Sequence, residues 1–146
     1  MAIQLILGTV LISLTLLVEV VFIGFASSVL TRIGDWLTSG RLMTKFTFTL
    51  LAVVLWMVAA ISVGVWIWAG AFLIIDQFEH LEEALYFSAV SITTLGYGDL
   101  VLDQEWRLLS GLIAANGLIL FSLATAFFIE FIGRVRSAQE RSTEKV

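Results

Sequence analysis

The sequence contains no cysteine and no proline, and it has one histidine in 146 residues. Without cysteine there is no disulfide framework and no thiolate metal site, and one histidine does not build a metal cluster. No apolar segment carries regularly spaced arginines, and no nucleophile stands in a pattern with a base. These absences argue against a voltage-sensing domain, a metalloprotein and an enzyme, and we expect no cofactor.

Charge is also scarce, since 14% of the residues are charged and 60% are hydrophobic. Runs of about 18 or more apolar residues are typical of membrane spans, and the segments 2–30, 46–75 and 108–132 reach that length. The charges inside them are Glu19 and Glu130. A soluble protein is therefore excluded. We expect an all-α membrane protein with membrane lipids as its surroundings.

The most informative stretch is a heptad between the second and third apolar runs, Thr93-Thr94-Leu95-Gly96-Tyr97-Gly98-Asp99. A membrane excludes irregular backbone unless it is buried in protein or lines a water-filled path. Glycine reaches positive φ at no steric cost, so the chain can turn its carbonyls inward there. Rings of such carbonyls replace the hydration shell of a potassium ion.

This heptad resembles the selectivity-filter signature of the potassium channel family, which usually reads Thr-Val-Gly-Tyr-Gly-Asp; Leu95 replaces the usual Val. The resemblance extends through 84–90, which is similar to the family's pore helix. It implies K⁺ as the permeant ion and a homotetramer, because a fourfold ring from one filter per chain needs four chains. The implied filter residues are Thr94, Leu95, Gly96, Tyr97 and Gly98, with K⁺ bound at the first four.

The resemblance also implies a support for the filter. In many family members the filter Asp is held by a donor on the pore helix, and Asp99 would here face Tyr86, where relatives often carry Trp. Tyrosine supplies a hydroxyl donor. Some relatives place a Glu behind the filter at the position of Val90, and this chain does not make that contact.

These features predict three transmembrane helices plus a re-entrant pore helix and a filter loop. The first transmembrane helix spans 1–30. It is followed by a cytoplasmic linker, 31–45, whose apolar spacing also suits an interfacial helix. The pore domain spans 46–134, with an outer helix 46–75, a pore helix 81–93, a filter 94–99 and an inner helix 107–134. A short cytoplasmic tail, 135–146, remains.

The inner helix carries the candidate cavity and gate residues. Gly117 falls where the family places a hinge glycine, although a small residue also permits close helix packing. The side chains that follow at 3-4-4 spacing share one helix face, and by resemblance they line the cavity: Leu118, Phe121, Thr125 and Ile129. Beside them, Glu130 either forms a ring that attracts cations or pairs with Arg134, four residues later.

Glu19 lies deep in the first apolar run. An ionisable group inside a span is costly and is a functional hypothesis by default. Three interpretations stay open: the carboxyl titrates as a sensor, bonds to a polar neighbour, or stays protonated in a packed helix.

Orientation follows from the basic residues, which accumulate in cytoplasmic loops. Apart from Arg107, every Lys and Arg lies within 31–45 or after residue 133. We therefore expect a multi-pass protein of the cell membrane with its N-terminus outside and its C-terminus in the cytoplasm. The outer region around the heptad is acidic, and nucleic-acid binding has no support.

The sequence thus predicts a potassium-selective channel subunit that conducts K⁺ passively. Two alternatives remain. A weakly selective cation channel is one, because Leu95 changes the packing behind the filter. A non-conducting subunit that modulates another channel through its first span is the other.

Overall fold

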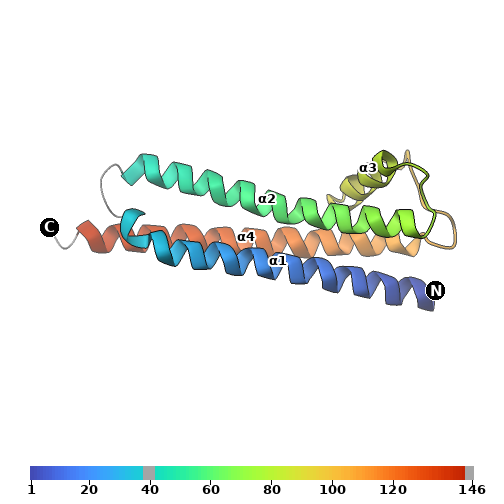
Figure 1. Ribbon diagram of the computed structural model, residues 1–146, viewed down its shortest axis with the longest axis horizontal. Coiled ribbons are helices and arrows are strands. Elements are labelled where there is room, and N and C mark those ends of the chain that lie inside the picture. Colours follow the sequence, from blue (N-terminus) through green and yellow to red (C-terminus); the bar gives the residue numbers. More distant parts are fainter. Residues whose placement is uncertain (38–41, 144–146) are drawn as a thin grey trace.

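The computed structural model describes residues 1–37 and 42–143, and it describes side chains for 1–32 and 44–137. Its elements are α1 (Ala2–Leu37), α2 (Leu42–Ile74), α3 (Leu81–Ile92) and α4 (Leu108–Thr143) (Figure 1). Within the described ranges, 3 helices are long and apolar enough to cross a membrane: Ala2–Arg32, Thr44–Ile74 and Leu108–Ser137. The predicted all-α membrane fold is confirmed.

The three long helices lie side by side, and the N-terminus lies at the same end as α3 (Figure 1). The α1 and α4 helices run parallel in one register. Near that end the Gln4 side-chain amide donates to the Glu105 carbonyl, and further along Asn116 Nδ2 donates to Thr15 Oγ1 at 2.8 Å. Both pairs are separated by 101 residues. The N-terminus and the heptad therefore share one side of the bundle.

The helices are longer than the apolar runs that predicted them. α1 continues to Leu37, into the expected linker, and α2 begins at Leu42 rather than at 46. α4 continues to Thr143, through most of the expected tail 135–146. Leaving the hydrocarbon does not end a helix, because its backbone hydrogen bonds are internal, and the chain has no proline to break one.

The expected interfacial helix is not a separate element in the described part of the linker. Residues 31–37 belong to α1, whose end bends toward the start of α2 (Figure 1). Gly40, the predicted end of that helix, lies outside the described residues. The predicted bounds of the short helix differ little from those observed, since α3 ends at Ile92 instead of 93.

Aromatic contacts fix α3 against α2. The Phe87 ring of α3 lies 5.3 Å from Phe72, edge to face at 83°, and 5.2 Å from Phe78. Phe72 also contacts Trp68 with ring centroids 5.7 Å apart. Edge-to-face pairs add about 0.5–1.5 kcal/mol beyond their area burial. This cluster positions the short helix, and so the heptad that follows it, at one end of the bundle.

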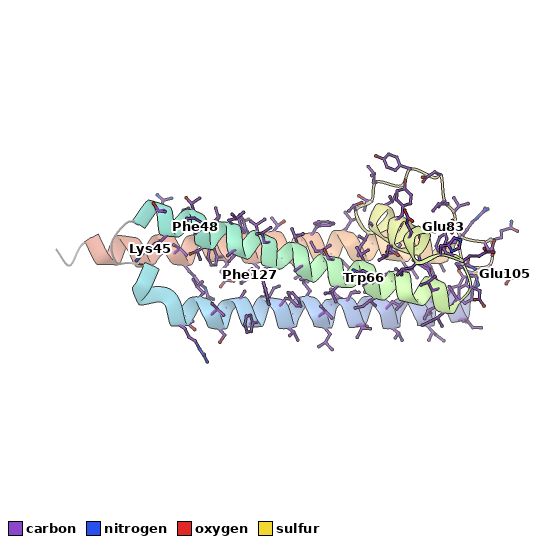
Figure 2. The ribbon with its side chains drawn as sticks, turned by 45° about the horizontal axis from the view of Figure 1, so that its top comes forward. Lys45, Phe48, Trp66, Glu83, Glu105 and Phe127 are labelled. Carbon is purple, nitrogen blue, oxygen red and sulfur yellow. The ribbon has the colours of Figure 1, made fainter. Side chains whose placement is uncertain are left out.

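A second aromatic cluster joins α1 to α2 toward the opposite end. Trp56 Nε1 donates to the Phe22 carbonyl at 3.0 Å, and its ring lies 4.7 Å from Phe22 and 5.1 Å from Phe25. Figure 2 shows Glu83 and Glu105 at the end that carries α3, with Lys45 and Phe48 at the opposite end. The α1 helix is thus packed along α2 and α4 over most of its length.

Candidate ion-conducting site

The α3 helix is too short to cross a bilayer. Its 12 residues give a length of about 18 Å at 1.5 Å per residue, against a hydrocarbon core of about 30 Å. Glu82 and Glu83 occupy its first turn, where negative charge complements the helix dipole. Its C-terminal end, with the negative pole, leads directly into the heptad.

The first residues of the heptad fold back onto the end of α3. The Thr94 amide donates to the Ser91 carbonyl at 3.0 Å, and the Leu95 and Gly96 amides donate to the Val90 carbonyl at 3.0 and 3.3 Å. These bonds use carbonyls that a helix end otherwise leaves without a partner. The amide side of the loop is therefore held toward α3.

The sign of φ alternates along the heptad. Thr94 has φ 59°, Gly96 φ 57° and Gly98 φ 77°, while Leu95 and Tyr97 between them have negative φ. Alternating right- and left-handed residues gather successive N–H groups on one side of the chain, so the carbonyls gather on the other. In the described part of the chain, the carbonyls of 94–98 accept none of the hydrogen bonds found. A row of unused carbonyl oxygens suits the binding of a dehydrated cation.

Asp99 is held by a side chain of α3. Tyr86 Oη donates to Asp99 Oδ2 at 2.7 Å, so the predicted contact is present. This hydrogen bond lowers the pKa of Asp99, helped by the backbone N–H groups of Asp99 and Leu100 and opposed by desolvation. The same bond, with desolvation and the Asp99 charge, raises the pKa of Tyr86. The pair therefore consists of a carboxylate and a neutral phenol at neutral pH.

A hollow of about 250 Å³ lies beside the loop, between α3 and α4. Its lining includes Tyr86, Val90, Thr94, Gly96, Asp99, Ser110 and Ala114. Leu95 does not line it. The Leu95 side chain is 55% exposed and that of Tyr97 68% exposed, so a single chain leaves the outer faces of the loop uncovered.

Gly117 packs against the end of α3. A Cβ placed there would collide with the Ile92 carbonyl oxygen, and it would lie 2.7 Å from the carbonyl carbon. Of the two interpretations of this glycine, the structure favours close packing. α4 therefore touches the backbone immediately before the heptad.

The other candidate residues of α4 share one uncovered face. Leu118 is 59%, Phe121 40% and Ile129 66% exposed, and Thr125 is also exposed. The Thr125 hydroxyl donates to the Phe121 carbonyl at 2.7 Å. The opposite face is buried against the other helices by Ile113, Leu120, Phe127 and Phe131.

Glu130 is paired along its own helix. Its Oε1 lies 2.5 Å from the terminal nitrogen Nη2 of Arg134 and 3.1 Å from Nε, while the two side chains stay 57% and 52% exposed. The chain thus forms the ion pair that was the alternative to a ring of free carboxylates.

Sequence reasoning missed one contact behind the loop. Thr15 of α1 and Asn116 of α4 are both buried and bond to each other, next to Gly117. A lone asparagine in an apolar run was the available signal, but nothing in the sequence named its partner. Among the described residues no group of three His, Cys, Asp or Glu side chains lies close enough to hold a metal ion.

The family model described as "Ion channel" matches residues 60–134, just over half of the 146-residue chain. The chain belongs to this ion channel family. The matched region begins in α2 and ends in α4, so it contains α3 and the heptad and leaves α1 outside. No curated protein and no solved structure matches the chain.

Proposed function

We propose that four copies of this chain assemble into a potassium-selective channel, with the heptads surrounding a central pore. The observation that carries this proposal is the alternating backbone of 94–98, whose amide side is held to α3 and whose carbonyls have no hydrogen-bond partner among the described residues. Membership of an ion channel family makes ion conduction the relevant chemistry. The Thr94 hydroxyl adds a further oxygen at the inner end.

A tetramer is supported by what one chain leaves uncovered. Tyr97 is 68% and Ile129 66% exposed, and large apolar side chains line the free face of α4. One chain offers one row of carbonyls, whereas a dehydrated ion needs oxygens from several directions. Four rows around one axis meet that requirement, and the α4 faces then enclose the cavity below them.

Selectivity for K⁺ over Na⁺ depends on how the side chains of the heptad pack around the carbonyls. Leu95 changes a side chain and not a carbonyl, and it lies outside the lining of the hollow behind the loop. This placement favours the selective channel over the weakly selective one. A non-conducting modulatory subunit has no observation of its own in its favour.

Flux through liposomes tests conduction itself. Purified protein is reconstituted in vesicles loaded with K⁺. A proton ionophore is then added so that H⁺ enters and balances the charge of the K⁺ that leaves, and K⁺ efflux is followed. The proposal predicts rapid K⁺ efflux that Ba²⁺ blocks and little efflux when Na⁺ replaces K⁺. Equal K⁺ and Na⁺ flux would support the weakly selective alternative, and no flux of either ion would support a modulatory subunit.

A further inference from the structure

Glu19 is a buried acidic residue of α1, outside the region that the family model matches. It is 1% exposed, and neither of its carboxyl oxygens has a hydrogen-bond partner in the described structure. It lies in a candidate membrane span, so bulk water does not solvate it. The helices of a single chain already bury the Glu19 side chain, so its burial does not depend on contacts with further copies.

Among the side chains that the structure describes, the elements around Glu19 supply no charge at its level. The register that pairs Thr15 with Asn116 places Glu19, one turn later, at the level of Leu120 in α4. On α4 the described charged side chains are Glu130, Arg134 and Arg136, beginning about ten residues, or about 15 Å, beyond that level.

The charged residues of the other packed elements also lie away from Glu19. α2 carries one charged residue, Lys45, in its first turns at the far end of the bundle (Figure 2). α3 has its acids, Glu82 and Glu83, in its first turn, whereas its last residue, Ile92, lies like Thr15 within 3.7 Å of a Cβ built at Gly64. On α1 itself the other charged residue with a described side chain is Arg32, more than three turns later.

An ionised carboxylate without partners is very costly in such a place, and a group there binds a proton instead. We propose that Glu19 is a proton-binding site, and that its proton keeps α1 packed on α2 and α4. Loss of the proton at alkaline pH would put an unpaired charge between three helices. The helix then moves away from the pore unit until the carboxylate reaches water or lipid headgroups.

The same contacts lead to the filter, and this step rests on the proposed function. Thr15 bonds to Asn116, whose neighbour Gly117 lies against the Ile92 carbonyl. Gly64 sits among Thr15, Leu120 and Ile92, with each about 3.6–3.7 Å from a Cβ built at that glycine. Removing α1 leaves the buried Asn116 amide without its partner and loosens the packing behind the heptad. Conduction should therefore fall at alkaline pH.

Infrared spectroscopy tests the proton directly, whether or not the protein conducts. At neutral pH the purified protein should show the carbonyl stretch of a protonated carboxyl group, and Glu19→Gln should remove it. The control Glu82→Gln removes an exposed carboxyl of α3 and should leave the band in place. Glu19→Met, apolar and of similar length, serves as a second variant if Gln impairs folding. No such band, or a band that survives both Glu19 variants, would overturn the proposal.

The movement of α1 is measured by spin labels, using the absence of native cysteine. Val21→Cys and Leu55→Cys place labels on exposed sites of α1 and α2, each 60% exposed. An excess of unlabelled chain keeps each measured pair within one subunit. The distance should increase at alkaline pH in the parent and stay constant in Glu19→Gln. An unchanged distance in the parent would contradict the coupling.

Flux assays complete the test and separate the two proposals. A pH-dependent band and distance without any K⁺ flux would leave the proton site intact and reject the proposed channel function. K⁺ flux with the same pH dependence in the parent and in Glu19→Gln would reject the coupling to the filter.

Discussion

At the scale of single residues, Gly117 is the position where the structure leaves no room. A methyl group there meets the backbone of Ile92, which does not yield as a flexible side chain would. We expect Gly117→Ala to destabilise the protein by at least the usual cost of overpacking, about 1–3 kcal/mol. Thermal unfolding in detergent measures this effect.

The matched control lies on the same helix. Gly111 has no atom within 4 Å of a Cβ built on it, so Gly111→Ala should not lower the unfolding temperature, since alanine is the better helix former. If the two alanine variants unfold alike, the close packing of α4 on the end of α3 is wrong.

Gly96 tests the backbone alone. Its φ is +57°, and a Cβ there would meet nothing within 4 Å in the same chain, so within one chain Gly96→Ala acts through conformation and not through collision. A left-handed conformation costs an L-residue about 1–2 kcal/mol, which favours a rearranged loop. K⁺ conduction should be lost, while Gly70→Ala, an open position in α2, should conduct normally. Unaltered selectivity in Gly96→Ala would remove the heptad from the permeation path.

The Tyr86–Asp99 bond predicts a pH dependence. Because the pKa of Asp99 is lowered, this support is fully present above the usual aspartate pKa, about 3.9, and is lost as the pH falls through the lowered value. Tyr86→Phe removes the donor and keeps the ring. The variant should lose current faster during sustained opening already at neutral pH, and acid should speed that loss less than in the parent, because the variant has no Tyr86–Asp99 bond left to lose. Identical time courses and acid sensitivity would exclude the support.

These residues also show which contacts could be predicted from the sequence. The partnership of Tyr86 with Asp99 was predictable from the resemblance to the potassium channel family, in which a donor on the pore helix holds the filter Asp, and the hydrogen bond is present. The tight contact of Gly117 with Ile92 was not, because two packing distances fit the same glycine until the path of α4 is known. The ion pair of Glu130 with Arg134 follows from their spacing of four residues, but the position of Glu130 beside Ile129 also allowed a ring of carboxylates.

At the scale of elements, α1 is the helix that the family match leaves out and that the structure packs closely on the rest. Thr15 links it to Asn116 by a buried hydrogen bond of 2.8 Å. Such bonds in membrane proteins contribute about 0.6 kcal/mol on average. We expect Thr15→Val, which keeps the shape, to weaken the packing of α1 and to increase proteolysis or hydrogen exchange in that helix.

Ser13→Ala is the control for this prediction. Its hydroxyl is exposed and donates to the Thr9 carbonyl of its own helix, so its removal should not change the exchange of α1. Equal exchange in Thr15→Val and the parent would show that the interhelical bond does not hold α1 in place.

Helix existence was easier to predict than helix length. Long apolar runs identify the spans, because lipid demands internal backbone hydrogen bonds. The ends at Leu37, Leu42 and Thr143 extend beyond those runs, because polar residues also form helices and no proline intervenes. The side of α4 against which α1 packs depends on Thr15, Asn116 and the small residue Gly64, and no periodicity in the sequence specified it.

At the scale of the whole molecule, one chain leaves one of its sides uncovered. Its carbonyl row and its apolar α4 face lie open, while its other face is closed by α1, α2 and α3. The proposed fourfold assembly uses the open side and leaves α1 at the periphery, where it contacts α2 and α4 of its own chain. In this proposed assembly the first helix supports the pore and does not form part of its wall.

The most direct test of the account is the reversal potential of the reconstituted protein between K⁺ on one side of a planar bilayer and Na⁺ on the other. Carbonyl oxygens that replace the hydration shell of K⁺ predict a current that reverses far from zero, close to the limit for a membrane permeable to K⁺ alone. Exchanging the two salts should invert the sign of that potential. A reversal potential near zero, with cations still passing, would contradict potassium selection by the heptad.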